Sequence, residues 1–544
     1  MVDPAKRIFI NDLVCEGCGD CSEKSNCLSV IPKETEFGRK RQIDQSACNK
    51  DYSCVNGFCP SFVAIVGGEL NKSPKIDVDL PLEDIPRPKT AKMQQGVTYN
   101  ILVTGVGGTG VITIGALIGM AAHLEGKGFA IHDSIGMAQK FGGVSSHVRI
   151  APSVGEIHAV QIPCASVDVL LGGDLPVTAL PKILSLVNPT KTQILINTNQ
   201  TVTGEFIQNL NFDFKNSELT KRICDSVETD VESMPATDIA VALTGDAIGA
   251  NLFLLGYACQ KGWLPVSLES LELAIDINGI AVKNNKYALA LGRYGTVDMT
   301  GLLAAISTDE NAENDIAVPL DDIVAKREKF LINYQDKDYA VQYLNLVDQA
   351  RIADVKLTQK AGAFTEAVAR YYFKLMAYKD EYEVARLYTD PRFIAQIKQK
   401  FTGKYKLKLY MAPPLISQRD TDTGEFKKRE FGAWVLVLFK LLTKLKGLRG
   451  TVFDIFGYTF ERRQERELIK EYSILVENII NDLSAKNYEK AVELASLPDQ
   501  MRGFGHVKER AIEIAKTREK ELLSEFYSSD GPGIPTVANY VSYM

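Results

Sequence analysis

Seven of the ten cysteines in this chain lie between Cys15 and Cys59, and their spacing points to one chemistry. Cys15, Cys18 and Cys21 follow one another at intervals of three residues. Such a run wraps a tight loop around one iron–sulfur cube, and a fourth thiolate arrives from elsewhere in the chain, often followed by proline. Cys59, which precedes Pro60, fits that role. The pattern therefore predicts a [4Fe–4S] cluster bound by these four cysteines.

Two other uses of these cysteines stay open. Zinc needs four ligands, usually as two separated pairs, which leaves no place for a third cysteine at Cys21. Disulfides are typical of small secreted scaffolds, whereas the rest of this chain resembles a cytoplasmic enzyme. Cys27, Cys48 and Cys54 remain after one cube is filled. They could hold a second cluster with a missing or non-cysteine ligand, or be buried thiols, since Cys27 is followed by Leu28 rather than proline.

Length and composition indicate a multidomain globular protein. The 544 residues are too many for one hydrophobic core and predict about three or four domains. The formal net charge of −6 argues against nucleic acid as the main partner. The apolar stretch at 431–439 is about half a membrane span and is followed by lysines, and the polar start at 1–7 does not resemble a signal peptide. We therefore expect a cytoplasmic protein without a membrane partner.

Changes in composition and in hydrophobic periodicity divide the chain into four parts. These are a cysteine module at 1–70, a proline-bearing linker at 71–97, a doubly wound α/β domain at 98–300 and a mostly helical extension at 301–544. The cysteine module should contain short strands at 7–10 and 62–66, and metal ligation would supply much of its stability. The linker favours an extended tether over packed structure. The expected fold class is thus a multidomain α/β protein with a small iron–sulfur module in front.

The α/β domain is expected to open with a buried strand at 99–104, because this run is continuously apolar. Four glycines follow it: Gly105, Gly107, Gly108 and Gly110. A helix at 111–124 and a strand at 129–133 complete one βαβ unit, whose helix N-terminus offers free N–H groups to a phosphate or carboxylate. Further strands are expected at 147–151, 159–162, 167–171 and 193–197, and further helices at 236–260, after Pro265 and at 282–290.

Three interpretations of the glycine turn stay open. The spacing of Gly105, Gly107 and Gly110 matches the dinucleotide fingerprint, and Asp133 lies where the ribose of NAD would need a carboxylate. Coenzyme A could use the same helix end through its phosphates. A tight turn that binds nothing would carry the same glycines. A second glycine turn brings Lys140, which could meet a phosphate, although such a lysine is more often only solvated.

No catalytic group stands out elsewhere. His132 and His147 fall inside predicted strands and are expected to be core or rim histidines. His506 in the helical extension is expected to be structural or at the surface. Three isolated cysteines are interpreted as buried apolar residues: Cys164, Cys224 and Cys259. The sequence thus predicts an electron-transfer cluster and a ligand-binding fold, but it shows no set of catalytic residues.

Taken together, these features resemble the 2-oxoacid:ferredoxin oxidoreductases, and in particular the C-terminal part of the indolepyruvate type. The likeness covers nearly the whole chain and is carried by segments 14–21, 36–41, 54–60, 100–110, 245–253 and 382–388. It implies a ferredoxin-like module, a γ-type α/β domain and the helical extension of the long indolepyruvate form. The resemblance assigns the cluster to Cys15, Cys18, Cys21 and Cys59, and a ligand or interface loop to the four glycines.

This family decarboxylates a 2-oxoacid on thiamine diphosphate and sends electrons one at a time through iron–sulfur clusters to ferredoxin. The acyl group commonly leaves on coenzyme A. The thiamine motif, Gly-Asp-Gly followed by paired asparagines, does not occur in this sequence. Where many γ domains carry Arg-Gly-Gly, the chain has Phe141, Gly142 and Gly143, which leaves coenzyme A or water open as acyl acceptor.

The resemblance therefore implies a split subunit or a fragment, with the thiamine centre on a partner chain. We expect an iron–sulfur electron-transfer and accessory subunit that acts with a thiamine-binding subunit, with ferredoxin and with a 2-oxoacid such as indolepyruvate or another arylpyruvate. The alternative is a stand-alone NAD-linked iron–sulfur oxidoreductase that uses Asp133.

Overall fold

The computed structural model describes most of the chain and divides it into two compact units. The described residues are 5–45, 48–71, 80–135, 142–202, 206, 209, 211–306, 319–413 and 427–528. One unit joins residues 1–70 to 316–544, and the other consists of 71–315. The predicted turn at Lys140, part of the linker (72–79) and the tail (529–544) lie outside the described residues.

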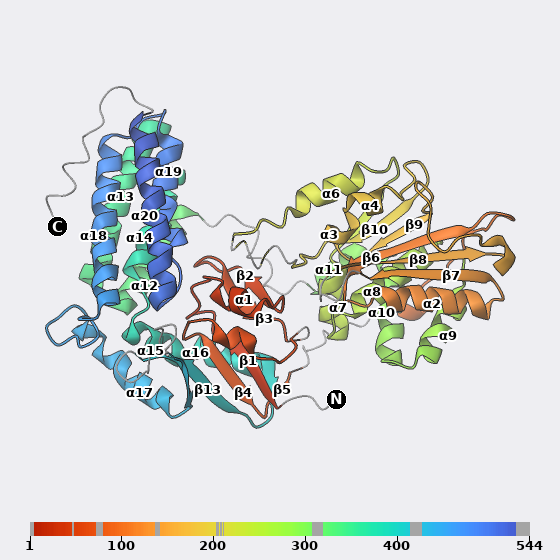
Figure 1. Ribbon diagram of the computed structural model, residues 1–544, viewed down its shortest axis with the longest axis horizontal. Coiled ribbons are helices and arrows are strands. Elements are labelled where there is room, and N and C mark those ends of the chain that lie inside the picture. The colour runs from red at the N-terminus through yellow and green to blue at the C-terminus, as the bar shows by residue number, and fades with distance from the viewer. Residues whose placement is uncertain are drawn as a thin grey trace. The chain divides into compact units, whose positions relative to one another are not determined.

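The first unit is built on an antiparallel sheet that the cysteine module shares with the C-terminal part (Figure 1). The strands in order are β1 (Lys6–Ile10), β4 (Phe62–Val66), β13 (Lys406–Met411) and β14 (Arg429–Gly432). The two strands predicted in the cysteine module are confirmed as β1 and β4. The cysteine module shares this sheet with the C-terminal part, because β4 pairs with β13 over Val63 to Val66. Without β13, β4 would be an exposed apolar edge.

Alternating side chains bury both faces of this sheet. Ile8 and Phe62 pack toward the cysteines, while Phe9, Val63 and Leu409 pack against three helices on the other face. Those helices are α15 (Glu381–Thr389), α16 (Pro391–Lys400) and α17 (Val435–Leu442). Burial on both faces explains why β1 and β4 read as continuous apolar runs.

Short elements between β1 and β4 carry the cysteines. They are α1 (Asp20–Ser25), the hairpin of β2 (Val30–Lys33) and β3 (Lys40–Ile43), and the 3₁₀ turn η1 (Ser53–Asn56). Two further short strands, β5 (Glu69–Leu70) and β12 (Phe401–Thr402), pair with each other. The helix α1, the β2–β3 hairpin and η1 thus lie with the cysteines over one face of the sheet.

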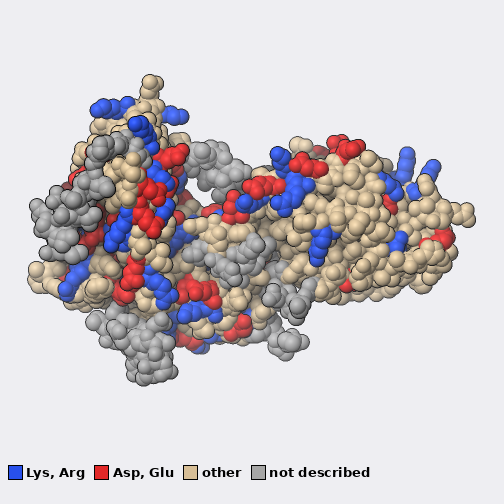
Figure 2. Space-filling model, turned by 45° about the horizontal axis from the view of Figure 1, so that its top comes forward, with Lys and Arg blue, Asp and Glu red and all other residues tan. Residues whose placement is uncertain are grey.

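The helical part of the first unit is a bundle around a core rich in tyrosine and phenylalanine. Its helices are α12 (Leu320–Tyr334), α13 (Lys337–Thr358), α14 (Ala363–Met376), α18 (Phe460–Asn481), α19 (Tyr488–Ser496) and α20 (Gly505–Ser528), with 3₁₀ turns η4 (Thr443–Leu448) and η5 (Leu497–Gln500). Figure 2 shows basic and acidic side chains intermixed on its visible surface. The helical extension is thus confirmed, apart from the strands it lends to the cysteine module.

The second unit is a mixed six-stranded sheet with helices on both faces. Its strand order is β11 (Val231–Met234), β10 (Gln193–Asn197), β9 (Val169–Gly172), β6 (Tyr99–Val106), β8 (Gly143–Ala151) and β7 (Gly128–Ile135). β6, β9, β10 and β11 run parallel, and β8 is antiparallel to both neighbours. The strand predicted at 159–162 is wrong, because this segment is a loop.

The helices of the second unit begin and end as follows: α2 (Val111–Leu124), α3 (Leu175–Thr178), α4 (Pro181–Leu184), α6 (Asn216–Cys224), α7 (Ala236–Thr244), α8 (Gly249–Gln260), α9 (Leu268–Asn278), α10 (Val282–Gly295) and α11 (Met299–Ile306), with 3₁₀ turns η2 (Leu82–Asp84) and η3 (Val154–Glu156). The helix predicted at 236–260 is two helices, because Gly245 has a φ of +78° and ends α7. Among the described residues no single helix is long and apolar enough to span a membrane. The helices α7 and α8 reach that length and hydropathy only when they are counted together, and they are bent by 112° relative to each other.

The described part of the predicted linker is packed rather than free. Ala91 donates its N–H to the carbonyl of Leu264 at 2.8 Å, and Gln260 donates to the carbonyl of Pro86 at 2.8 Å. Leu82 and Met93 pack on the core of the α/β unit. The prolines prevent regular secondary structure here, but the apolar residues between them still bind this segment to its own domain.

Candidate functional site: a cavity lined by four cysteines

The four cysteines predicted to bind a cluster line one small cavity: Cys15, Cys18, Cys21 and Cys59. Cys15 and Cys21 are buried, and Cys18 and Cys59 are partly exposed. Cys15 and Cys18 lie on the loop between β1 and α1, Cys21 lies in the first turn of α1, and Cys59 precedes β4. Because β1 and β4 are paired neighbours, the loop and the fourth cysteine meet at the same end of the sheet. The structure thus brings together cysteines that are separated by 38 residues in sequence.

Two glycines allow the backbone segments around this cavity to approach closely. A Cβ on Gly57 would lie 2.6 Å from the Cα of Cys21 and 2.8 Å from its backbone nitrogen. Gly17 has a φ of +70°, and a Cβ there would meet the carbonyl of Arg39 at 2.1 Å. Gly17 also donates its N–H to the sulfur of Cys15 at 3.3 Å. These contacts fix the cysteine loop between the β3 strand and the segment before Cys59.

The electrostatics of the cavity oppose ionisation of the thiols in the absence of a cation. Burial, together with the neighbouring Cys59, raises the pKa of Cys18 and of Cys21. Burial also raises the pKa of Cys59, against the lowering effect of Lys428. Metal centres bind thiolates, so metal binding at such a site must release protons. The positive charge of the metal would then offset the repulsion between neighbouring thiolates. The arrangement therefore favours a positively charged centre.

Two basic side chains adjoin the cysteines, and the sequence analysis did not identify either. Arg41 on β3 is 1% exposed and lines the same cavity. Burial lowers the pKa of Arg41, while Cys21 and Cys15 act to raise it. Lys428 donates to the carbonyl of Gly57, and its ammonium lies 4.6 Å from the ring centre of Phe62. Only the fold places Lys428 beside Cys59, because the two are far apart in sequence.

The remaining three cysteines form a second group. Burial raises the pKa of Cys54 to about 12, with further raising effects from Cys27, Cys48 and Asp51. Asp51 lies three residues after Cys48 and three before Cys54, so it stands where the middle cysteine of a three-cysteine run would stand. Its carboxylate accepts hydrogen bonds from the backbone N–H and the hydroxyl of Ser53. This spacing could have been recognised in the sequence.

The arrangement of the cysteines bears on the three alternatives of a cluster, a zinc ion and disulfides. All ten cysteines are free of disulfides. Within the described ranges, no three His, Cys, Asp or Glu side chains converge as ligands of one metal ion. A cube binds each cysteine through a different iron, so its ligands surround a cavity rather than converge on one point. The donor set and its arrangement therefore fit a cluster better than a single zinc ion.

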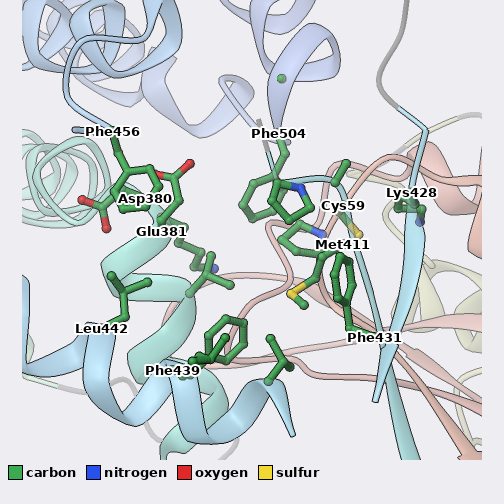
Figure 3. Close-up of a pocket in the computed structure, with 18 of the residues that line it drawn as sticks. Cys59, Asp380, Glu381, Met411, Lys428, Phe431, Phe439, Leu442, Phe456 and Phe504 are labelled. Carbon is green, nitrogen blue, oxygen red and sulfur yellow. The ribbon is translucent and has the colours of Figure 1, made fainter. Parts of the chain in front are cut away.

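A larger, mostly apolar cavity of about 410 Å³ adjoins Cys59 (Figure 3). Figure 3 shows Met411, Phe431 and Phe439 around it, with Cys59 at one side and the acidic residue Glu381 at another. Its other lining side chains include exposed apolar residues of and beside α17: Trp434, Leu438, Leu441 and Leu445. Cys59 lines both cavities, so the four-cysteine site has an apolar approach from outside.

The glycine turn of the second unit is held by the protein's own side chains. Asp174 accepts the N–H of Val106 at 2.5 Å, and Asn251 donates to the carbonyl of Thr109. Gly107 donates its N–H to the carbonyl of Gly142 at 2.8 Å. Burial raises the pKa of Asp174 to about 6. A buried carboxylate below this turn disfavours a phosphate.

The position of Asp133 also departs from the dinucleotide pattern. Asp133 is on β7, and β8 lies between β7 and β6, the strand that leads into the glycines. Two strand spacings, about 10 Å, therefore separate Asp133 from the glycine-bearing strand. In the dinucleotide fold the acidic residue is on the strand next to the glycine turn. The geometry does not favour the NAD interpretation.

The other residues singled out from the sequence have structural environments. His132 and His147 face each other across β7 and β8 with ring centres 5.9 Å apart, and His147 accepts the N–H of Ile162 at 3.2 Å. The ring of His506 packs 4.7 Å from that of Phe58. Three isolated cysteines were expected to be buried, which is correct for Cys259 and wrong for two in loops or at a helix end, Cys164 and Cys224.

Comparison with known proteins identifies the class. Residues 100–294 match the family of pyruvate ferredoxin/flavodoxin oxidoreductases, and residues 320–521 match a family of unknown function (DUF6537). Indolepyruvate oxidoreductase subunit IorB of Archaeoglobus fulgidus is 31% identical over 180 residues, which are 32% of this chain and 83% of the relative. The same subunit of Pyrococcus horikoshii is 29% identical over 208 residues, 38% of this chain and 98% of the relative.

The γ subunit of a keto/oxoacid ferredoxin oxidoreductase from Geobacter sulfurreducens is 21% identical, over 37% of this chain and 98% of that chain, with a TM-score of 0.26. The chain belongs to the 2-oxoacid:ferredoxin oxidoreductase family.

Proposed function

We propose that this chain is the iron–sulfur electron-transfer and accessory subunit of a thiamine-dependent 2-oxoacid:ferredoxin oxidoreductase of the indolepyruvate type. The observation that carries this proposal is the single cavity lined by Cys15, Cys18, Cys21 and Cys59. Four soft sulfur ligands around one cavity suit a [4Fe–4S] cluster, in which each thiolate takes one iron. When bound, such a cluster takes up and releases single electrons.

The residues of this chain would hold the centre, balance its charge and give access to it. Arg41 and Lys428 bring positive charge to a site of four thiolates, which lowers the cost of burying negative charge. Cys59 lines the apolar cavity as well, and Trp434 and Leu441 are 61% and 60% exposed there. Exposed apolar patches are typical of surfaces that bind another protein. A partner chain docked there would come close to one ligand of the cluster.

The carbon chemistry is assigned to a partner. The thiamine motif is missing from this sequence, and the relatives are named as one subunit of an indolepyruvate oxidoreductase. We infer a thiamine diphosphate-binding subunit as partner, ferredoxin as electron acceptor, and indolepyruvate or another arylpyruvate as the 2-oxoacid. A cytoplasmic location is part of this proposal, because a reducing compartment suits thiolate ligands. Coenzyme A as acyl acceptor stays open, since Asp174 disfavours a phosphate at the glycine turn.

A second cluster is proposed at Cys27, Cys48 and Cys54, with Asp51 as an oxygen ligand. Asp51 keeps the three-residue interval of the first motif, and its charge acts on Cys54. Iron analysis distinguishes the cases, with roughly four iron atoms per chain for one cluster and roughly eight for two. Asp51→Ala should then remove the iron of the second site and leave that of the first.

The central experiment is anaerobic purification of the full chain, followed by iron, labile sulfide and zinc analysis. The proposal expects iron and sulfide with a reducible absorbance near roughly 400 nm. Cys21→Ser should lose the iron of the first site, whereas Cys259→Ser, buried in the other unit, should retain it. Zinc without iron would overturn the proposal.

A second experiment tests the partner and the reaction. The chain should co-purify with a thiamine-binding subunit, and the complex should reduce ferredoxin with indolepyruvate or phenylpyruvate. Turnover of a 2-oxoacid by this chain alone would contradict the assignment. Tight NADH binding that is lost in Asp133→Ala would instead support the stand-alone NAD-linked oxidoreductase.

A further inference from the structure

A third cavity in the first unit, of about 360 Å³, shares only Glu16 with the four-cysteine cavity. It lies between the β2–β3 hairpin and α14, with residues of η5 and α20 at one side. This volume is in the range of small-molecule binding sites. Ten basic and five acidic residues line it, so the cavity is strongly cationic although the whole chain is acidic.

The positive charge is concentrated in one buried group. Its members are four cations and two carboxylates: Lys40, Lys374, Lys379, Arg502, Glu16 and Asp499. Lys379 pairs with Glu16 at 2.5 Å. Asp499 alone serves two cations, with Arg502 at 2.5 Å and Lys374 at 3.5 Å. Two positive charges in this group thus lack a counter-charge, and buried charges of this kind are costly unless they are paired.

Two of the cations that line this cavity have side-chain donors without a partner among the described residues. Lys40 is 9% exposed, and in the described part of the chain no hydrogen bond or ion pair reaches its ammonium. Arg502 is 8% exposed, and its Nη1 has no hydrogen-bond partner among the described residues. Buried donors are normally satisfied, so both nitrogens call for an acceptor beyond the described residues. An anion in the cavity would satisfy them.

The same cavity has an aromatic wall. Phe37, Phe330 and Phe373 line it with ring centres 5.2 to 5.6 Å apart. The guanidinium of Arg327 lies 5.3 Å from the ring centre of Phe373 and 5.8 Å from that of Phe37. A ligand that fills the cavity would therefore meet apolar surface as well as charge.

We propose that this cavity binds an organic phosphate, a phosphate monoester joined to an aromatic or other apolar group. A monoester carries close to two negative charges and three acceptor oxygens, which match the two uncompensated charges and the free donors of Lys40 and Arg502. A carboxylate supplies one charge and would leave part of the group unbalanced. The three phenylalanines would contact the organic part. The proposal does not depend on the presence of a cluster.

The pKa values of the buried lysines agree with a missing anion. Burial lowers the pKa of Lys374 to about 7, against the raising effect of Asp499. Burial also lowers the pKa of Lys40 to about 8, helped by the neighbouring Lys379. A bound dianion would keep both ammonium groups charged.

Lys40 could instead balance the charge of the cysteine site. Arg41 and not Lys40 lines the cysteine cavity, and Lys40 lines the cationic one. The two functions predict different results in a Lys40→Met variant, which separates them experimentally.

The test is isothermal titration of the full, anaerobically purified chain with inorganic phosphate, phenyl phosphate and AMP, and with adenosine as the neutral control. Phenyl phosphate should bind at least about tenfold more tightly than inorganic phosphate, and adenosine should not bind. Tighter binding of AMP than of phenyl phosphate would identify a nucleotide rather than a simple ester. Lys40→Met and Arg502→Met should each weaken binding by about tenfold or more, whereas Lys470→Met, at an exposed cation outside the cavity that pairs with Glu467, should change it less than about twofold.

Lys40→Met has a second readout that a structural role would not give. Because it removes an uncompensated buried charge, this variant should unfold at a higher temperature than the wild type when no ligand is present. The proposal is overturned if the wild type binds none of the phosphates, or if Lys40→Met binds them unchanged. A Lys40→Met variant that melts lower and shifts only the reduction potential would assign Lys40 to the cysteine site instead.

Discussion

Lys40 and Arg41 are consecutive residues of β3, and their side chains line two different cavities. The guanidinium of Arg41 faces the cysteines, while the ammonium of Lys40 faces the cationic cavity on the other side of the hairpin. Alternation along a strand makes this possible, because successive side chains point to opposite faces. One short strand therefore separates the proposed electron-transfer site from the proposed phosphate site and contributes a buried cation to each.

Arg41→Met should make reduction of the proposed cluster harder. Removal of a buried positive charge beside Cys15 and Cys21 disfavours the addition of an electron. We expect the potential to become more negative by about 60 mV or more, which is about tenfold in the one-electron equilibrium constant. A spectroelectrochemical titration measures this shift. Arg392→Met, a cation that is 56% exposed, is the matched control and should leave the potential nearly unchanged.

Gly57→Ala should prevent assembly of the four-cysteine site. The added Cβ would lie within 2.9 Å of the Cα, N and Cβ atoms of Cys21, and these atoms belong to the loop that must close around the cluster. Iron content after anaerobic purification should fall at the first site. Gly447→Ala is the control, because nothing lies within 4 Å of a Cβ at Gly447. Equal iron content in both variants would refute the importance of this close approach.

Arg449→Met should strongly destabilise the first unit. Arg449 and Asp380 are each 3% exposed and form two hydrogen bonds, at 2.6 and 2.9 Å, and the guanidinium lies 3.7 Å from the ring centre of Tyr334. Loss of the cation leaves a buried carboxylate without its partner, at a cost of about 3–5 kcal/mol. Denaturant unfolding measures this cost.

The exposed pair of Arg351 and Asp321 provides the comparison for this ion pair. Asp321 is 81% exposed, so Arg351→Met should cost less than about 1 kcal/mol. Arg449→Lys should recover only part of the loss, because lysine cannot form both hydrogen bonds in the same plane. A similar cost for Arg449→Met and Arg351→Met would show that burial does not strengthen the first pair.

Glu125 should make the stability of the α/β unit depend on acid pH. Burial would raise the pKa of Glu125, but hydrogen bonds from Lys127 and from the N–H of Ser267 lower it to about 2. Because the pKa of Glu125 is lower in the folded protein than in the unfolded chain, its ionised side chain stabilises the fold at pH values above about 4.5. This stabilisation is lost as the pH falls from 4.5 toward 2. Glu125→Gln should therefore cost about 1–2 kcal/mol near pH 7 and less near about pH 3.5, since solvent screens part of the interaction.

Chemical unfolding of wild type and variant at both pH values measures this difference. Glu228→Gln, at an exposed position of the same unit, should show no comparable change between the two pH values. A cost of Glu125→Gln that does not vary with pH would mean that its hydrogen bonds do not depend on ionisation.

Local patterns in the sequence were sufficient for several parts of the fold. The run from Tyr99 to Leu124 predicts a buried strand, a glycine turn and a helix, and the structure confirms β6 and α2. The helix predicted at 282–290 is also present, as the first part of α10, because apolar spacing is a local signal. The missed loop at 159–162 and the break at Gly245 arise from contacts and turn chemistry that a short window of sequence does not contain.

The amino-acid sequence by itself determined that Cys15, Cys18 and Cys21 lie close together, because residues at intervals of three belong to one short segment. It also determined the βαβ start of the second unit, through an apolar run interrupted by glycines. Only the tertiary structure decided that β13 completes the sheet of the cysteine module, that Lys428 lies beside Cys59, and that Lys40 and Arg502 face one cavity. These relationships join residues far apart in the chain, and they depend on how buried faces pack, which no local spacing encodes.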